Sequence, residues 1–250
     1  MAVSDFAGIA CDHETTDAQV AEVVAARVYE SPWHARRAFG FGASDVPALL
    51  VGLGRRDVAT VTGHVKAAAN RSARWGNVPR IVAEKAGLKA PLKHGGGGDR
   101  EAELIQSWRD GLPMGSMIDR SSVEWEMRPQ SIRTPVRDPE CEWLAATLDG
   151  WAIDVFGDLI VLEAKCGDPN QTTAAWPADG SCPWFWASQV QAQMAATTAR
   201  SAIVICGVGW SYRQEGPIVT WHVERDDALI AEIRACVVEA WAMVEKLREK

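Results

Sequence analysis

The sequence predicts an α/β fold, in which a central mixed β-sheet carries helices on both of its faces. Three apolar runs have the character of buried strands, at residues 159–162, 202–208 and 218–223. Two longer segments, 184–198 and 226–248, are expected to be helical. A chain of 250 residues is long enough for one domain with a substantial core. Strands and helices that alternate in this way indicate the α/β class.

The elements that precede the strands are expected to be helical. Residues 17–30 form an amphipathic pattern, and they belong to an N-terminal extension, residues 1–32, with this one helix. The rest of the chain, residues 33–250, is expected to form one domain. Its first helices are expected at residues 45–51, 57–69, 77–87 and 101–108.

A β-hairpin is the clearest local feature of the sequence. One strand is expected at 151–156 and a second at 159–165, with a turn at Gly157-Asp158. Side chains two residues apart on a strand share a face, so Glu163 and Lys165 point the same way. Asp149 can lie beside them across the hairpin. Two further strands are expected near residues 123–128 and 143–148.

The charged side chains of this hairpin suit phosphodiester hydrolysis with a metal ion. Mg²⁺ prefers oxygen ligands, and Asp149, Glu163 and the carbonyl of Ala164 would supply three of them. Lys165 can hold the attacking water or take a proton from it. The alternative is a plain turn followed by a solvated ion pair. The apolar run before Glu163 favours function, because charges that end a buried strand are more often functional than charges on an open face.

Glutamines of the helix at 184–198 are candidates for the same site. Gln189 and Gln193 are four residues apart and share a helix face, whereas Gln191 is rotated away. Gln189 is therefore expected to face the site. There its amide can orient a water molecule or a phosphate without adding charge.

Several short motifs follow one another along residues 33–245. They are Trp33-His34-Ala35-Arg36-Arg37, Gly42-Ala43-Ser44-Asp45-Val46, Gly97-Gly98-Asp99-Arg100-Glu101, Asp149-Gly150, Leu162-Glu163-Ala164-Lys165-Cys166, Gln189-Val190-Gln191 and Val223-Glu224-Arg225-Asp226. In type and order they resemble the motifs of the phage lambda exonuclease and YqaJ-like viral recombinase family. This family lies within the PD-(D/E)xK nuclease superfamily, so the resemblance implies a restriction-endonuclease-like core.

The resemblance implies a role for each matched residue. Asp149, Glu163 and the Ala164 carbonyl would bind the catalytic metal, which is Mg²⁺ with Mn²⁺ as the alternative, and Glu101 would contribute to a second metal or its waters. Asp149, Glu163, Lys165 and Gln189 would form the catalytic set, with Lys165 and Gln189 positioning the water.

The resemblance also implies that Arg37 and Ser44 hold the 5′-phosphate of a DNA end. Physical chemistry supports this pair, because Ser44 can cap a short helix that begins at Asp45, where an anion is favoured. Arg37 adds a donor fork that suits phosphate. The alternative is a plain N-cap and a surface charge.

The fourth acid depends on a choice between two alignments. Trp75-Gly76 also resembles the family motif before the helical glutamate, but Arg80 stands where the glutamate should be. The alignment through Gly97 places Glu101 at that position and opens a helix, so we prefer it.

The family resemblance implies a metal-dependent 5′→3′ exonuclease on linear double-stranded DNA, with residues 33–250 as the exonuclease domain. It would release mononucleotides and leave a 3′ single strand for phage-type recombination. The implied partners are double-stranded DNA ends, a single-strand annealing protein and two further copies in a homotrimer. Two alternatives stay open: an endonuclease of the same superfamily, and a non-catalytic protein that binds DNA ends.

Charge is unevenly distributed along the chain. The net charge is −7, but residues 33–100 hold twelve Lys and Arg against four acids, which suits contact with a DNA backbone.

Tryptophans Trp176, Trp184 and Trp186 are candidates for base stacking. The six cysteines show no zinc spacing and are expected to be free thiols. Without a signal pattern or a long apolar run, the chain is expected in the cytoplasm of a bacterial or phage-infected cell, with no membrane contact.

Overall fold

The structure is a computed structural model that describes residues 40–57, 78–89, 98–125, 135–167, 177–210 and 216–249. The expected N-terminal extension with its helix, residues 58–69 of the expected helix at 57–69, and Arg37 lie outside the described residues. No helix of the described part is long and apolar enough to cross a membrane.

A five-stranded mixed sheet is the central element. Its strand order is β2-β5-β6-β7-β8, in which β6 and β7 are parallel and the other neighbouring pairs are antiparallel. The parallel pair needs a crossover connection, which helix α9 provides. The strands are β2 (Glu124–Trp125), β5 (Gly150–Ile153), β6 (Leu159–Gly167), β7 (Ser201–Val208) and β8 (Ile218–Glu224).

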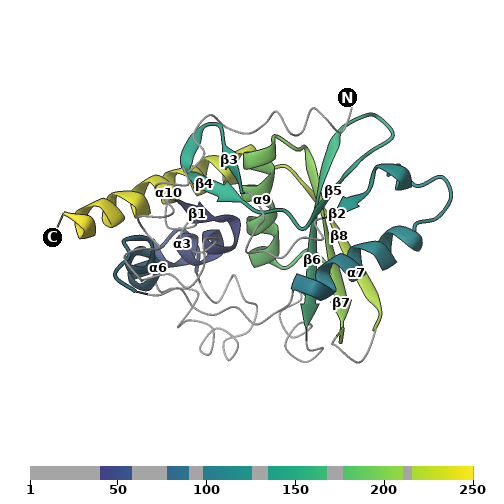
Figure 1. Ribbon diagram of the computed structural model, residues 1–250, viewed down its shortest axis with the longest axis horizontal. Helices are drawn as coiled ribbons and strands as arrows, with labels where there is room; N and C mark the ends of the chain where they lie inside the picture. The colour runs from purple at the N-terminus through teal and green to yellow at the C-terminus, as the bar shows by residue number, and fades with distance from the viewer. Residues whose placement is uncertain are drawn as a thin grey trace.

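Helices cover both faces of this sheet, as the sequence predicts. Helix α7 (Gly98–Asp110) packs on one face and α9 (Trp184–Thr197) on the other (Figure 1). The side chains of β6 alternate between the two resulting cores. Leu162 and Ala164 pack with α7, whereas Val161 belongs to the core that contains α9.

A second, smaller sheet lies beyond α9. It is three-stranded, with the order β1-β4-β3, and is formed by β1 (Phe41–Gly42), β3 (Val136–Asp138) and β4 (Cys141–Ala146). The helices α3 (Val46–Gly52), α6 (Val78–Lys85) and α10 (Asp227–Arg248) lie on this side of the molecule (Figure 1). Since α9 packs against both sheets and against α10, most of its side chains are buried.

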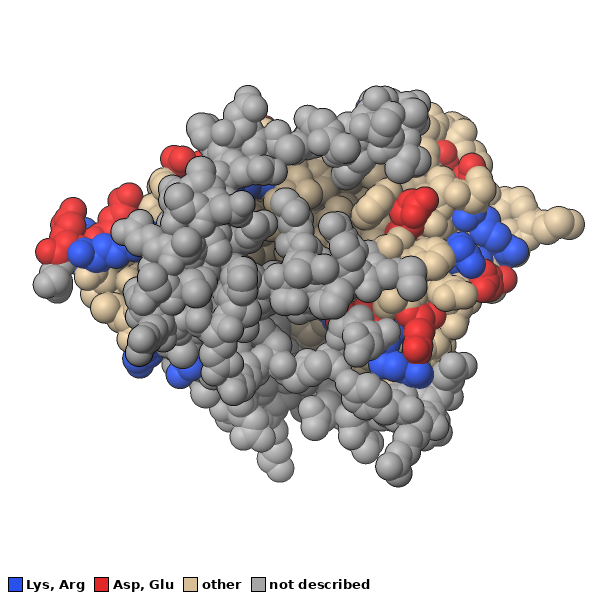
Figure 2. Space-filling view, in the orientation of Figure 1, with Lys and Arg blue, Asp and Glu red and all other residues tan. Residues whose placement is uncertain are grey.

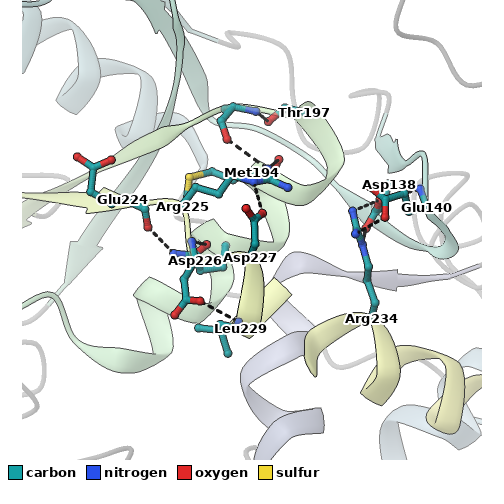
Figure 3. Close-up of polar contacts among 12 residues, drawn as sticks. Asp138, Glu140, Met194, Thr197, Glu224, Arg225, Asp226, Asp227, Leu229 and Arg234 are labelled. Atoms are coloured by element: carbon teal, nitrogen blue, oxygen red, sulfur yellow. Dashed lines mark hydrogen bonds and ion pairs between the residues drawn. The ribbon is translucent and has the colours of Figure 1, made fainter. Parts of the chain in front are cut away.

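A buried ion pair connects α10 to the smaller sheet. The guanidinium of Arg234 contacts both carboxylate oxygens of Asp138, at 2.7 and 2.9 Å, and also reaches Glu140 at 2.6 Å (Figure 3). The Asp138 side chain has no exposed surface, so its charge depends on this partner. The N-terminus of α10 is capped by Asp226, which accepts a hydrogen bond from the amide of Leu229 (Figure 3).

The expected elements are largely confirmed, with three differences. The first strand of the hairpin ends at Ile153, because Asp154 turns the chain by accepting hydrogen bonds from the amides of Phe156 and Asp158. The strand expected at 143–148 is Cys141–Ala146 and belongs to the second sheet, and strands β1 and β3 were not predicted. Both are two or three residues long, which is too short for a periodic pattern.

Candidate active site

Strand β6 places Glu163 and Lys165 on the face that α9 covers. Glu163 is almost completely buried, with 2% of its surface exposed, while the side chain of Lys165 is about one quarter exposed. The ammonium group of Lys165 donates to Oε1 of Glu163. The pair therefore lies at the end of the buried part of the strand, where a charged group keeps access to solvent.

Helix α9 contributes two amides to the same carboxylate. Gln189 Nε2 lies 2.6 Å from Glu163 Oε1, and Gln193 Nε2 lies 2.5 Å from Oε2. The spacing of four residues puts both glutamines on one face, as the sequence indicates. Gln191 points elsewhere and bonds the backbone of Glu224 and Asp226. The contact of Gln189 agrees with its expected position, whereas no role was assigned to Gln193 although the same spacing pointed to it.

Asp149 joins the site from the residue before β5. Its Oδ2 accepts a hydrogen bond from the amide of Ala164 over 3.0 Å, and 7% of the residue is exposed. Strand β5 begins only at Gly150, which pairs with Leu162, so the Asp149 side chain bonds β6 where the strand ladder has ended. The N–H and the carbonyl of a strand residue point to the same side of the strand, so the Ala164 carbonyl also points to the side on which Asp149 lies.

Glu101 approaches the group from the first turns of α7. Burial raises the pKa of Asp149 well above its ordinary value, and the negative charges of Glu163 and Glu101 raise it further. The structure therefore places Glu101 where its charge acts on Asp149. Arg80, its rival in the other alignment, lies on α6 and pairs with Glu84 at 2.8 Å.

Lys165 remains an ammonium ion in this environment. Burial alone lowers its pKa, but the negative charges of Glu163, Asp149 and Glu101 and the hydrogen bond to Glu163 outweigh that effect, and its pKa lies above its ordinary value. A lysine in this state is a hydrogen-bond donor and a positive charge. It can hold an anionic oxygen or a water.

The donor groups of the site fit a hard divalent cation. Across the described ranges, no three His, Cys, Asp or Glu side chains are gathered closely enough to enclose a metal ion by themselves. Mg²⁺ does not need such a cage, since it is commonly held by one or two carboxylates and keeps several waters. Asp149, Glu163 and the Ala164 carbonyl offer this kind of oxygen set. The pKa of Asp149 is raised by burial first and then by the negative charges of Glu163 and Glu101, which a bound cation would offset.

The structure corrects the expected cap at Ser44. Ser44 is exposed and lies inside the 3₁₀ turn η2 (Ala43–Asp45), while Asp45 occupies the N-cap position of α3. Asp45 instead accepts a hydrogen bond from the amide of Gly42, at 2.9 Å, and pairs with the buried Lys85 at 3.1 Å. Ser44 is therefore held in a turn that packs against α9, not at a helix N-terminus.

Most of the described basic residues of segment 33–100 take part in ion pairs. Arg55 and Arg56 pair with Glu239 and Glu232 of α10, and Arg100 pairs with Glu103. In Figure 2, blue and red side chains of the described residues lie next to one another at both ends of the visible face. The described part of the segment thus serves partly to hold α10.

The tryptophans proposed for base stacking differ in position. Trp186 is buried in the core against Phe185 and Trp221, so it is not available to a base. Trp184 is half-buried at the start of α9. Trp176 lies outside the described residues.

The fold and the site define an α/β protein with a carboxylate, lysine and glutamine group on β6, the middle strand of its five-stranded sheet. Two structures of the alkaline exonuclease LHK-Exo from Laribacter hongkongensis are similar to it, and both cover 87% of this chain and 93% of their own. The complex of LHK-Exo with dAMP is 21% identical with a TM-score of 0.55, and the other structure is 20% identical with a TM-score of 0.54.

A phage-related exonuclease from Haemophilus somnus 129PT is 14% identical with a TM-score of 0.47, over 83% of this chain and 94% of that one. Comparison with known protein families and with curated protein sequences finds no match. The similarity to the two LHK-Exo structures shows that the chain has the fold of this alkaline exonuclease. This agrees with the family resemblance that its motifs indicate.

Proposed function

We propose that this protein is a Mg²⁺-dependent 5′→3′ exonuclease that degrades one strand of linear double-stranded DNA. The observation that carries the proposal is that Lys165 and Gln189 contact the same oxygen of Glu163, beside the buried Asp149. When bound, the ion supplies a water of lowered pKa and neutralises charge on the phosphate. Mn²⁺ is the alternative ion.

The side chains of the site have separate tasks in this proposal. Asp149 and Glu163 hold the ion together with the Ala164 carbonyl, and Glu101 adds negative charge that favours a cation nearby. Lys165 donates hydrogen bonds to the attacking water or to a phosphate oxygen. Gln189 orients the same water with its neutral amide, which is kept in place by Glu163.

Two observations support an exonuclease acting on DNA ends. LHK-Exo, whose fold this chain shares, is described in complex with dAMP, which fits release of mononucleotides. The turn that carries Ser44 packs against α9, the helix that also carries Gln189, so one helix connects the catalytic group to the turn where Ser44, with Arg37, would hold a 5′-phosphate. The resulting 3′ single strand would suit recombination with a single-strand annealing protein, in the cytoplasm, and the active form would be a homotrimer.

The test uses the full-length protein and three substrates: linear duplex with 5′-phosphate, linear duplex with 5′-hydroxyl, and closed circular duplex. A fourth reaction adds EDTA to the phosphorylated linear duplex. We expect mononucleotides from the phosphorylated duplex, slower digestion of the hydroxyl form, and no product with circles or chelator. Cutting of circles would favour the endonuclease, and activity in EDTA would contradict the metal mechanism.

Variants separate the catalytic proposal from the binding alternative. Glu163→Gln and Lys165→Ala should each abolish activity, whereas Glu224→Gln, at a side chain 76% exposed, should not change it. A wild-type protein that binds DNA ends but has no nuclease activity would support the non-catalytic alternative. Arg37→Ala should raise KM for the phosphorylated duplex and reduce its advantage over the hydroxyl form. Light scattering of the purified protein tests the trimer.

A further inference from the structure

Gln193 is the second glutamine that contacts Glu163, and the roles proposed above do not use it. It is fully buried, and its Nε2 lies 2.5 Å from Glu163 Oε2. Gln189 and Lys165 contact the other oxygen, Oε1. The carboxylate of Glu163 is therefore held at both of its oxygens. Among the described residues, Gln193 is the only one that donates a hydrogen bond to Oε2.

The orientation of the Gln193 amide follows from the chemistry of its partner. An ionised carboxylate only accepts hydrogen bonds, so the amide nitrogen must face Glu163. The amide oxygen then points away, and within the described part of the chain this buried oxygen has no hydrogen-bond partner. Burying such a group costs free energy that an apolar side chain of similar size would avoid. A buried glutamine with one satisfied end fits a residue that is needed for its contact with Glu163.

The backbone around Gln193 is rigid. Its carbonyl accepts a hydrogen bond from Thr197 Oγ1 at 2.8 Å, and α9 packs against both sheets. A side chain anchored on such a helix can fix the position of the group that it contacts. The carboxylate of Glu163, at the end of a flexible side chain, is such a group.

We propose that Gln193 is a positioning residue that fixes the Glu163 carboxylate in the orientation required to bind the catalytic metal ion. The inference rests on the proposed nuclease function. Each carboxylate oxygen has two lone pairs, so Oε2 can accept the Gln193 hydrogen bond and retain a second acceptor direction. Gln193 holds Oε2, and Gln189 and Lys165 hold Oε1, so rotation of the carboxylate is blocked.

The test compares two identical substitutions on one helix. Gln193→Met removes the donor with little change in size, and Gln191→Met removes hydrogen bonds of 2.7 and 2.9 Å to Glu224 and Asp226, away from the site. Mn²⁺ binding to each full-length protein is measured by calorimetry, together with kcat and KM on phosphorylated linear duplex. For Gln193→Met we expect Kd for Mn²⁺ to rise by about 10–100-fold, as found when a residue that orients a metal ligand is removed. Its kcat should fall with KM unchanged.

Gln191→Met should lower the melting temperature and leave the affinity for Mn²⁺ unchanged. Gln193→Ser, which cannot reach Glu163, is a second variant with the same expected loss of affinity, in case the methionine does not fit. In a Glu163→Gln background, Gln193→Met should cause no further loss of Mn²⁺ affinity, because Gln193 acts through Glu163.

A folded Gln193→Met protein that keeps the wild-type Mn²⁺ affinity and kcat would overturn the inference. It would also be overturned if Gln193→Met lowered Mn²⁺ affinity equally in the wild-type and Glu163→Gln backgrounds. A wild-type protein that neither binds Mn²⁺ nor cuts DNA would overturn the proposed function as well. The wild-type measurements alone show that outcome, so the two failures are distinguishable.

Discussion

The side chain of Asp149 accepts a hydrogen bond from the backbone amide of Ala164, with 3.0 Å between Oδ2 and N. This bond attaches the residue before β5 to the neighbour of Glu163 on β6. It brings two carboxylates that are fourteen positions apart in the sequence into one buried group. The site therefore depends on a local backbone contact as much as on the acids themselves.

Asp149→Asn is expected to stabilise the metal-free protein and to abolish nuclease activity. The pKa of Asp149 is raised in the folded state by burial and by the charges of Glu163 and Glu101, so its ionised form destabilises the fold at neutral pH. Asparagine keeps an oxygen that can accept from Ala164 and removes the charge. The gain should be about 0.5–2 kcal/mol, measured as a higher melting temperature in EDTA.

The same variant should lose its response to the metal ion. Mg²⁺ should raise the melting temperature of the wild-type protein, because a ligand that binds only the folded state stabilises it. Asp149→Asn should show a much smaller rise. A variant that is no more stable than wild type in EDTA would contradict the electrostatic argument.

Gly150→Ala should destabilise the protein and reduce its activity. A Cβ at Gly150 would lie 2.6 Å from the carbonyl oxygen of Glu124 and 3.2 Å from Ile105 Cδ1. Since the first contact is with backbone, β2 or β5 has to move, at about 1–3 kcal/mol, and Asp149 moves with β5. Urea denaturation and kcat measure both effects. Gly111→Ala is the control, because its nearest contacts are at 3.5 Å, and it should match the wild type.

Arg234→Leu should destabilise the fold without a direct effect on the site. It leaves Asp138 buried and charged without its bidentate partner, which costs about 3–5 kcal/mol. Asp138→Asn should cost less, because Arg234 keeps Glu140 (Figure 3). Denaturant midpoints measure both losses, and kcat of the folded fraction should stay at the wild-type value. Equal losses for the two variants would contradict this asymmetry.

Cys182 and Cys206 should react slowly with iodoacetamide at pH 8. Burial raises the pKa of Cys182 to about 12 and that of Cys206 to about 11, so their thiolate fractions are small. We expect alkylation at least about a hundredfold slower than for an ordinary thiol, whose pKa is about 8.5. Mass spectrometry of the native protein gives the rates, and the same protein in guanidinium chloride is the control. Rapid labelling of the partly exposed Cys182 in the native state would contradict its raised pKa.

Much of the fold could be predicted because burial imposes a period on long elements. The last helix carries apolar residues at helical spacing, and five of them, Ile230, Ile233, Val237, Trp241 and Val244, are all buried. Strand β7 also follows the sequence pattern, because a strand buried on both faces requires a continuous apolar run. The expectation that residues 218–223 form another buried strand was wrong: β8 is the last strand of the five-stranded sheet, and Trp221 is its one buried residue. Strands β1 and β3 could not be predicted, since they exist only where β4 offers them a partner.

The sequence by itself determined which residues share a face. Side chains alternate along a strand, so Glu163 and Lys165 share a face. Residues four apart share a face of a helix, so Gln189 and Gln193 point together and Gln191 points elsewhere. Tertiary structure alone decided which faces meet, because packing depends on contacts between elements far apart in the chain. It placed α9 over β6, so that Gln193 reaches Glu163, and it brought Glu101 close to Asp149. It also placed Ser44 inside the turn η2 and Asp45, which pairs with the buried Lys85, at the N-cap of α3.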